Sequence, residues 1–181
     1  MKQRFRHITP LLLSAGVAFG CVAEGPPLPP RPEPRSIAQP QGMEATTLVL
    51  TADQVPADSN GNGYADTFRV IIYLFGDRRR HELPIHVDGS FVFELSNPDG
   101  DLLARWVLDE EETREGRFEA MVGPGYGFTL NILDVASDRI SDRIANLRCV
   151  FSPRRGEPIE VRGAATIRVG PIGTRPRQPA R

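Results

Sequence analysis

Residues 58–66 carry oxygen-bearing side chains at regular spacing in a glycine-rich stretch. Asp58, Asn60 and Asn62 stand two residues apart, and Asp66 follows four residues after Asn62. Calcium is a hard cation that takes roughly six to eight oxygen ligands, so short carboxylate and amide side chains at this spacing suit it. The sequence therefore predicts a weak, structural calcium site at residues 58–66. The alternative is a polar Asn-Gly turn that connects two strands without a metal.

The stretch DSNGNGYAD resembles the calcium loops of the dockerin and thrombospondin type 3 families, and the first nine positions of an EF-hand loop. The resemblance places Asp58, Asn60 and Asn62 at ligand positions 1, 3 and 5. It implies that the carbonyl oxygen of Tyr64 is the ligand at position 7 and that Asp66 is the ligand at position 9. It covers nine of 181 residues and implies no fold.

The sequence departs from an EF-hand at position 12, where the last acidic ligand belongs. Arg69 occupies this position, and a strand pattern follows it instead of a helix pattern. A further ligand has to come from elsewhere in the chain. Asp53 and Asp77 are the nearest candidates in sequence.

His81, His86 and Asp88 form a second candidate metal centre of the two-histidine, one-carboxylate kind. Residues five apart in a strand point to opposite faces, so only a bend at Pro84 would bring both histidines to one ion. A small secreted hydrolase that uses this centre, or a pair of carboxylates, is therefore the alternative function. The chain has no G-x-S-x-G motif that would mark a catalytic serine, and Cys149 lies in an apolar run. The sequence therefore shows no recognisable serine or cysteine nucleophile.

Composition excludes several other classes of protein. The formal net charge is −1, without the basic excess typical of nucleic-acid binding. Lys2 is the single lysine of the chain, so a protein that loses its N-terminus has no lysine for a P-loop or a Schiff base. Glycine and proline number 17 each, which favours many turns over a helical bundle.

The N-terminus has the organisation of an export signal. Three basic residues stand in the first six positions, residues 11–19 are mostly apolar, and the small Ala18 and Gly20 precede Cys21. This order resembles the signal peptide of bacterial lipoproteins. The resemblance implies that residues 1–20 are removed and that Cys21 is acylated, which would anchor the exported protein to a membrane in the periplasm or at the cell surface. Cleavage by an ordinary signal peptidase after Gly20 or Ala23 is the alternative.

Two proline-rich segments flank the predicted domain. Residues 21–42 include seven prolines in the 16 residues from 25 to 40, which predicts an extended tether in the polyproline II conformation. Residues 171–181 contain three prolines, three arginines and few apolar residues, which predicts a disordered tail. The folded domain is therefore expected at residues 43–170.

The predicted domain is all-β, an antiparallel β-sandwich of about eight strands with one short crossover helix. Asp88-Gly89 predicts a tight hairpin turn, and Gly123–Gly127 reads as a turn before a strand. The helix is expected at Ser137–Leu147, where apolar residues recur with helical spacing. Strands are expected at 46–51, 68–75, 85–87, 91–95, 102–108, 128–132, 147–151 and 159–169.

Together these features predict a non-catalytic, exported, lipid-anchored envelope protein with a binding or structural role. Its partners would be the membrane, reached through the lipid, and an envelope protein or a glycan. A carbohydrate-binding module is a further alternative, and it requires an exposed Trp106. A buried Trp106 would instead belong to the core.

Overall fold

The computed structural model describes residues 38–172 with the exception of residue 55. The predicted signal peptide (1–20), the predicted acylation site Cys21 and residues 22–37 of the predicted tether lie outside the described residues, as do residues 173–181 of the predicted tail. No helix among the described residues is long and apolar enough to cross a membrane.

Most of the regular secondary structure in the described chain consists of strands. They are β1 (Thr47–Ala52), β2 (Tyr64–Ala65), β3 (Thr67–Phe75), β4 (Gly89–Ser96), β5 (Leu102–Leu108), β6 (Arg117–Ala120), β7 (Gly123–Asn131), β8 (Ile144–Pro153), β9 (Ile159–Glu160), β10 (Ala165–Arg168) and β11 (Gly170–Pro171). The helical elements are α1 (Glu110–Glu115) and the 3-10 turn η1 (Ile132–Asp134).

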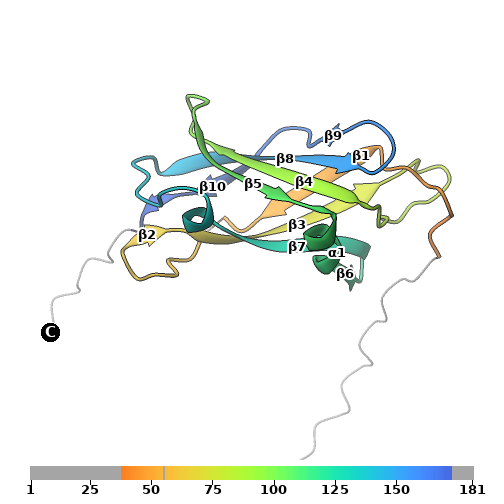
Figure 1. The fold of residues 1–181 in the computed structure, drawn as a ribbon, viewed down its shortest axis with the longest axis horizontal. Helices are drawn as coiled ribbons and strands as arrows, with labels where there is room; N and C mark the ends of the chain where they lie inside the picture. Colours follow the sequence, from red (N-terminus) through yellow and green to blue (C-terminus); the bar gives the residue numbers. More distant parts are fainter. Residues whose placement is uncertain (1–37, 55, 173–181) are drawn as a thin grey trace, which may run out of the picture. The chain divides into compact units, whose positions relative to one another are not determined.

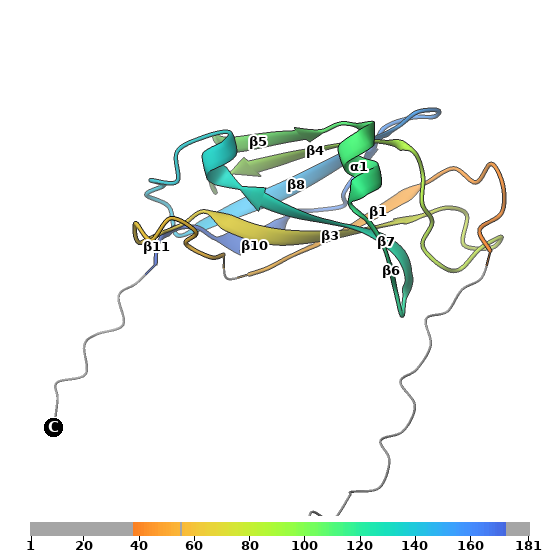
Figure 2. The ribbon, with the colours of Figure 1, turned by 60° about the horizontal axis from the view of Figure 1, so that its bottom comes forward.

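Two antiparallel sheets lie against each other, as Figure 1 and Figure 2 show. One sheet has the strand order β1-β3-β7-β6, and the other has the order β10-β8-β4-β5 with β9 paired to β8. A separate pair joins β11 to β2. This arrangement confirms the predicted all-β antiparallel sandwich.

The core lies between the two sheets and is rich in aromatic rings. Along β3 and β4 every second side chain is buried, as the period-two pattern predicts. Phe91 of β4 contacts Tyr126 and Phe128 of β7 edge-on, with ring centroids 5.2 and 5.7 Å apart. The strand predicted at residues 68–75 is confirmed as β3, which lies between β1 and β7.

The predicted hairpin at Asp88-Gly89 is wrong. Gly89 begins β4, pairs with β8 and does not adopt a positive φ, while Ile85 bridges to β3 in the other sheet. The glycine is needed for space rather than for a turn. A Cβ atom at this position would lie 2.7 Å from Cζ of Phe151, and closer still to the carbonyl oxygen of Ser152.

The predicted helix at Ser137–Leu147 is also wrong. Residues 137–143 have no regular structure, and β8 begins at Ile144. The inward side chains of β8 alternate with outward ones, and this period-two burial outweighs the weaker helical spacing. The buried residues of this strand are Ala145, Leu147, Cys149 and Phe151.

The short helix of the domain is α1, in an acidic run that begins at Asp109. Asp109 caps its N-terminus by accepting hydrogen bonds from the backbone of Glu111 and Glu112. The side chain of Glu112 in turn accepts from the backbone N–H of Asp109, which completes a capping box. The helix connects β5 to β6.

The glycine-rich stretch Gly123–Gly127 forms part of strand β7 and is not a turn. Its glycines leave room for aromatic rings on the face of the strand. A Cβ atom on Gly125 would lie 2.8 Å from the ring of Tyr73 and 2.9 Å from that of Phe118.

Trp106 belongs to the core. It is 5% exposed, its ring meets Phe68 edge-on at 5.8 Å, and its Nε1–H donates to the carbonyl oxygen of Asn131 at 2.9 Å. Burial with a satisfied N–H leaves no indole face for a sugar. A carbohydrate-binding surface built on Trp106 is therefore ruled out.

The C-terminal end of the predicted tether is bonded to the domain. The side chain of Gln39 donates to the carbonyl oxygen of His86 at 3.0 Å and accepts from its N–H at 2.9 Å. This pair of bonds fixes where the chain enters the sandwich.

Candidate functional site

Residues 58–66 wrap around the carboxylate of Asp58. Its Oδ1 accepts backbone hydrogen bonds from Gly61 at 2.7 Å and Asn62 at 3.2 Å, and its Oδ2 accepts from Gly63 at 2.8 Å. Gly61 and Gly63 have φ values of 75° and 87°, in the left-handed region that favours glycine. The glycines therefore allow the tight curvature that points the loop's amides at one carboxylate.

Asn60 and Asn62 link this loop to a distant aspartate. The Nδ2 groups of both residues donate to Oδ2 of Asp138, at 3.2 and 2.7 Å. Their Oδ1 atoms accept from the backbone of Asn62 and Tyr64, which leaves one lone pair free on each oxygen. Asp138 is only 3% exposed, so its carboxylate is buried against the loop.

Asp66 is fully buried and has a different set of partners. Its carboxylate accepts from the N–H of Ser59 at 2.9 Å, from Oγ of Ser59 at 2.9 Å and from Oγ1 of Thr67 at 2.7 Å. Burial by itself raises the pKa of Asp66, but these hydrogen bonds outweigh it and hold the pKa below its ordinary value. Asp66 is therefore a buried, ionised carboxylate. Its hydrogen bonds to Ser59 join the end of the loop to its beginning.

The structure places the predicted ligands in one loop and adds an acid that the sequence did not suggest. Tyr64 lies in β2 directly after the Asn-Gly turn, while Arg69 is exposed on β3 and contributes no acid. Asp77 lies beyond the opposite end of β3, where it accepts from the backbone of Arg79. The acid that the structure brings to the loop is Asp138, whereas the sequence offered Asp53 or Asp77. No signal in the sequence pointed to it, since it precedes β8 by six residues and is 72 residues from Asp66.

The three aspartates Asp58, Asp66 and Asp138 have no basic partner in the described part of the chain. The ion pairs found there involve other acids: Asp88, Glu94, Glu110 and Glu160. Buried charges are usually paired with an opposite charge or bound to a metal ion. The loop and Asp138 thus combine three negative charges with the free lone pairs of amide oxygens.

The histidines do not form a metal centre. Nε2 of His86 lies 3.0 Å from the carbonyl oxygen of Gly125, and Asp88 pairs with Arg117. Between residues 38 and 172, residue 55 apart, no three His, Cys, Asp or Glu side chains are grouped to hold a metal ion. Binding at the loop would accordingly depend on amide and carbonyl oxygens as well as on carboxylates.

Cys149 is fully buried, and this burial raises the pKa of its thiol, so it is not a nucleophile.

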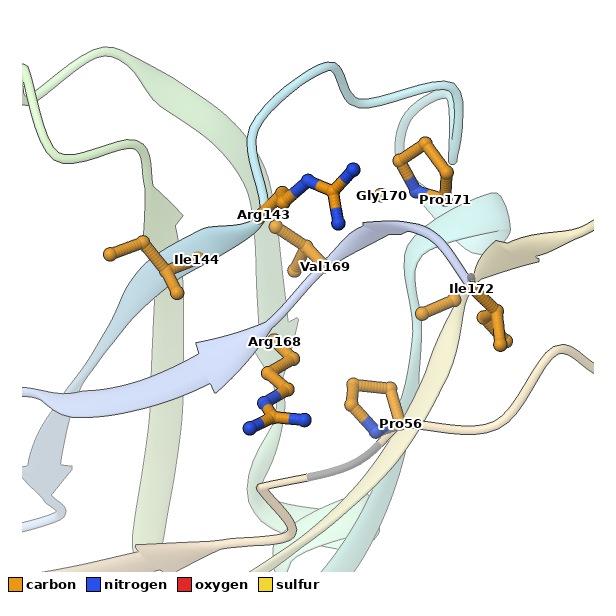
Figure 3. A pocket seen from close by; sticks show the side chains of 9 residues that line it. Pro56, Arg143, Ile144, Arg168, Val169, Gly170, Pro171 and Ile172 are labelled. Carbon is orange, nitrogen blue, oxygen red and sulfur yellow. The ribbon is translucent and has the colours of Figure 1, made fainter. Parts of the chain in front are cut away.

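A pocket of about 330 Å³ lies beside the loop, and nothing in the sequence pointed to it (Figure 3). Its wall is mostly apolar and includes Ala65 of β2 and the chain around β11. Arg143 and Arg168 lie at its rim, but Figure 3 shows their side chains pointing in different directions, so they do not converge on one anion. The remaining lining residues are Pro56, Ile144, Val169, Gly170, Pro171 and Ile172.

Comparisons with protein-family models, with curated proteins and with solved structures found no match for this chain.

Proposed function

We propose that this protein is a non-catalytic β-sandwich of the cell envelope, held to a membrane by a lipid on Cys21, in which loop 58–66 and Asp138 bind a structural calcium ion. The observation that carries the calcium site is the burial of Asp66 and Asp138 without a basic partner among the described residues. A divalent cation would neutralise most of the charge that these groups and Asp58 bring together.

The proposed ligands are the carboxylates of Asp58 and Asp138, the amide oxygens of Asn60 and Asn62, and the carbonyl oxygen of Tyr64, with Asp66 binding through water. Oxygen donors of this kind are those that calcium prefers. The ion would join the loop before β3 to the segment before β8. A site with so few carboxylates should bind calcium with a Kd of about 10⁻⁴–10⁻³ M, the range of extracellular modules.

We expect calcium to raise the melting temperature of the soluble domain by about 5 °C. At a concentration about tenfold above Kd, binding to the folded state alone adds about 1.4 kcal/mol to the free energy of unfolding. In a domain of this size that gain corresponds to a shift of a few degrees. The measurement is a thermal melt in about 10 mM calcium and in excess EDTA, with magnesium as a second comparison.

Two charge-neutralising variants test which acid matters. Asp138→Asn should lose the calcium-dependent rise while its melting temperature in EDTA stays at or above that of the wild type, because an unpaired buried charge is removed. Asp134→Asn is the matched control, since Asp134 is exposed in the same region of the chain, and it should keep the full rise. Identical wild-type melts in calcium and EDTA would mean that residues 58–66 form only a hydrogen-bonded turn.

We expect mass spectrometry of the mature protein to find Cys21 acylated at a new N-terminus. Removal of residues 1–20 leaves 19 basic against 23 acidic residues, so the mature chain has a formal charge of −4 and gains nothing from anionic lipid. Acyl chains contribute about 0.8 kcal/mol per buried methylene, enough to hold the protein at a membrane when more than one chain is present.

Cys21→Ser should therefore release the folded domain into the soluble fraction. Cys149→Ala is the control, because Cys149 is buried in the core and its removal should leave the protein at the membrane. A soluble wild-type product that begins at unmodified Cys21 or at Glu24 would contradict the anchor.

A further inference from the structure

The last described strand, β11, is held by the candidate calcium loop. It belongs to neither large sheet and pairs only with β2, whose residues Tyr64 and Ala65 lie inside the loop. The N–H of Ile172, directly after β11, donates to the carbonyl oxygen of Gly63 at 2.8 Å. The C-terminal end of the described chain therefore depends on the loop keeping its shape.

The other side of β11 packs against the segment that carries Asp138. The N–H of Val169 donates to the carbonyl oxygen of Arg143 at 3.1 Å. A Cβ atom on Gly170 would lie 2.8 Å from the carbonyl oxygen of Ile140, and closer still to that of Asp142. Gly170 thus fits between the loop and residues 138–143 because it has no side chain.

Further hydrogen bonds join the loop, the Asp138 segment and β11. Two hydrogen bonds from Asn60 and Asn62 to Asp138 join the loop to the Asp138 segment, and β11 adds a ladder with only two residues on each strand. Asn62 hydrogen bonds to an acid in each segment: its backbone N–H donates to Oδ1 of Asp58 at 3.2 Å, and its Nδ2 donates to Oδ2 of Asp138 at 2.7 Å. A bound ion would add ligand bonds from both segments.

We propose that calcium acts as a latch for the C-terminal end of the domain, holding β11 between loop 58–66 and the Asp138 segment. Loss of the ion releases β11. Because Gly170, Pro171 and Ile172 form part of the pocket wall in Figure 3, the pocket is complete only while β11 is docked. This inference rests on the proposed calcium site and adds a conformational consequence to it.

The test is amide hydrogen exchange of Ile172, measured by NMR on the soluble Cys21→Ser protein in calcium and in EDTA. If release of β11 requires loss of the ion, a calcium concentration about tenfold above Kd should slow exchange at Ile172 about tenfold. Gly100, whose N–H donates to Asn97 in the exposed turn after β4, is the reference and should exchange equally in both conditions. Asp138→Asn should abolish the effect at Ile172, and Asp134→Asn should retain it.

A second variant displaces β11 without touching a proposed ligand. Gly170→Ala should give fast exchange at Ile172 in both conditions and, because coupling is reciprocal, should weaken calcium binding in a calorimetric titration by up to about tenfold. Gly163→Ala is the control, since Gly163 also has a positive φ, 88°, but has nothing within 4 Å of a Cβ, and it should bind calcium like the wild type.

The outcomes separate this inference from the proposed function. A calcium-dependent rise in melting temperature with unchanged exchange at Ile172, or with unchanged affinity in Gly170→Ala, overturns the latch and leaves the calcium site standing. The absence of any calcium-dependent rise overturns both. Slower exchange at Ile172 in calcium, lost in Asp138→Asn, supports both.

Discussion

We expect Phe91→Ala to lower the free energy of unfolding by about 3–5 kcal/mol. Phe91 is fully buried, and its ring lies next to those of four other residues, with centroid distances between 4.8 and 6.0 Å. These neighbours come from both sheets, so truncation leaves a cavity at the contact between them. The rings involved are those of Phe93, Tyr126, Phe128 and Phe151.

Collapse into that cavity is restricted because Tyr126 is fixed in place. Its hydroxyl donates to the carbonyl oxygen of Val87 at 2.8 Å and accepts from its N–H at 2.7 Å. Domains of this size have a total stability of about 5–15 kcal/mol, so the loss should be evident in urea denaturation. Leu102→Ala, at a side chain 58% exposed, should change stability by less than about 0.5 kcal/mol. A loss at Phe91 as small as that at Leu102 would mean that the sheets do not pack through these rings.

Gly89→Ala is expected to be the second most damaging change, with a loss of about 3 kcal/mol. The added methyl group would overlap the backbone of Ser152 and the ring of Phe151, and a backbone atom paired in β8 cannot move aside cheaply. The loss is measured by chemical denaturation of the purified domain.

The matched control is Gly127→Ala in β7. Gly127 is also a strand glycine without a positive φ, but a Cβ there would meet Phe118 at an ordinary 3.4 Å. Alanine at this position should be neutral or stabilising by up to about 1 kcal/mol, because glycine loses more backbone entropy on folding. Equal effects at both glycines would show that close approach to β8 is not what selects Gly89.

The sequence alone predicted the class of the fold and most of the strands. The bounds of β5 agree with the prediction, and β3 begins one residue earlier than expected. Both strand predictions succeeded because burial along a strand alternates from one residue to the next. This alternation is a local property that can be read directly from consecutive residues in the sequence.

The failed predictions share a physical cause. At Gly89 the local Asp-Gly dipeptide favoured a hairpin turn. In the structure the neighbouring strand β8 lies so close to Gly89 that only glycine fits. At Ser137–Leu147 a helical spacing of isoleucines competed with the inward alternation of β8, and contacts with β4 and β10 decided for the strand. In both places the deciding partner is more than 15 residues away in sequence.

For the candidate site, the sequence by itself determined the loop, because oxygen-bearing side chains and glycines at fixed spacing are a local pattern. Only the tertiary structure decided that Asp138 accepts hydrogen bonds from that loop, that Asp66 bonds to Ser59 and Thr67, and that β11 pairs with β2. The physical reason is that a residue from a distant segment is not part of the local spacing pattern, so the sequence does not reveal that it lies near the loop. Its position follows from the packing of the two sheets, which brings the chain before β8 beside the chain before β3.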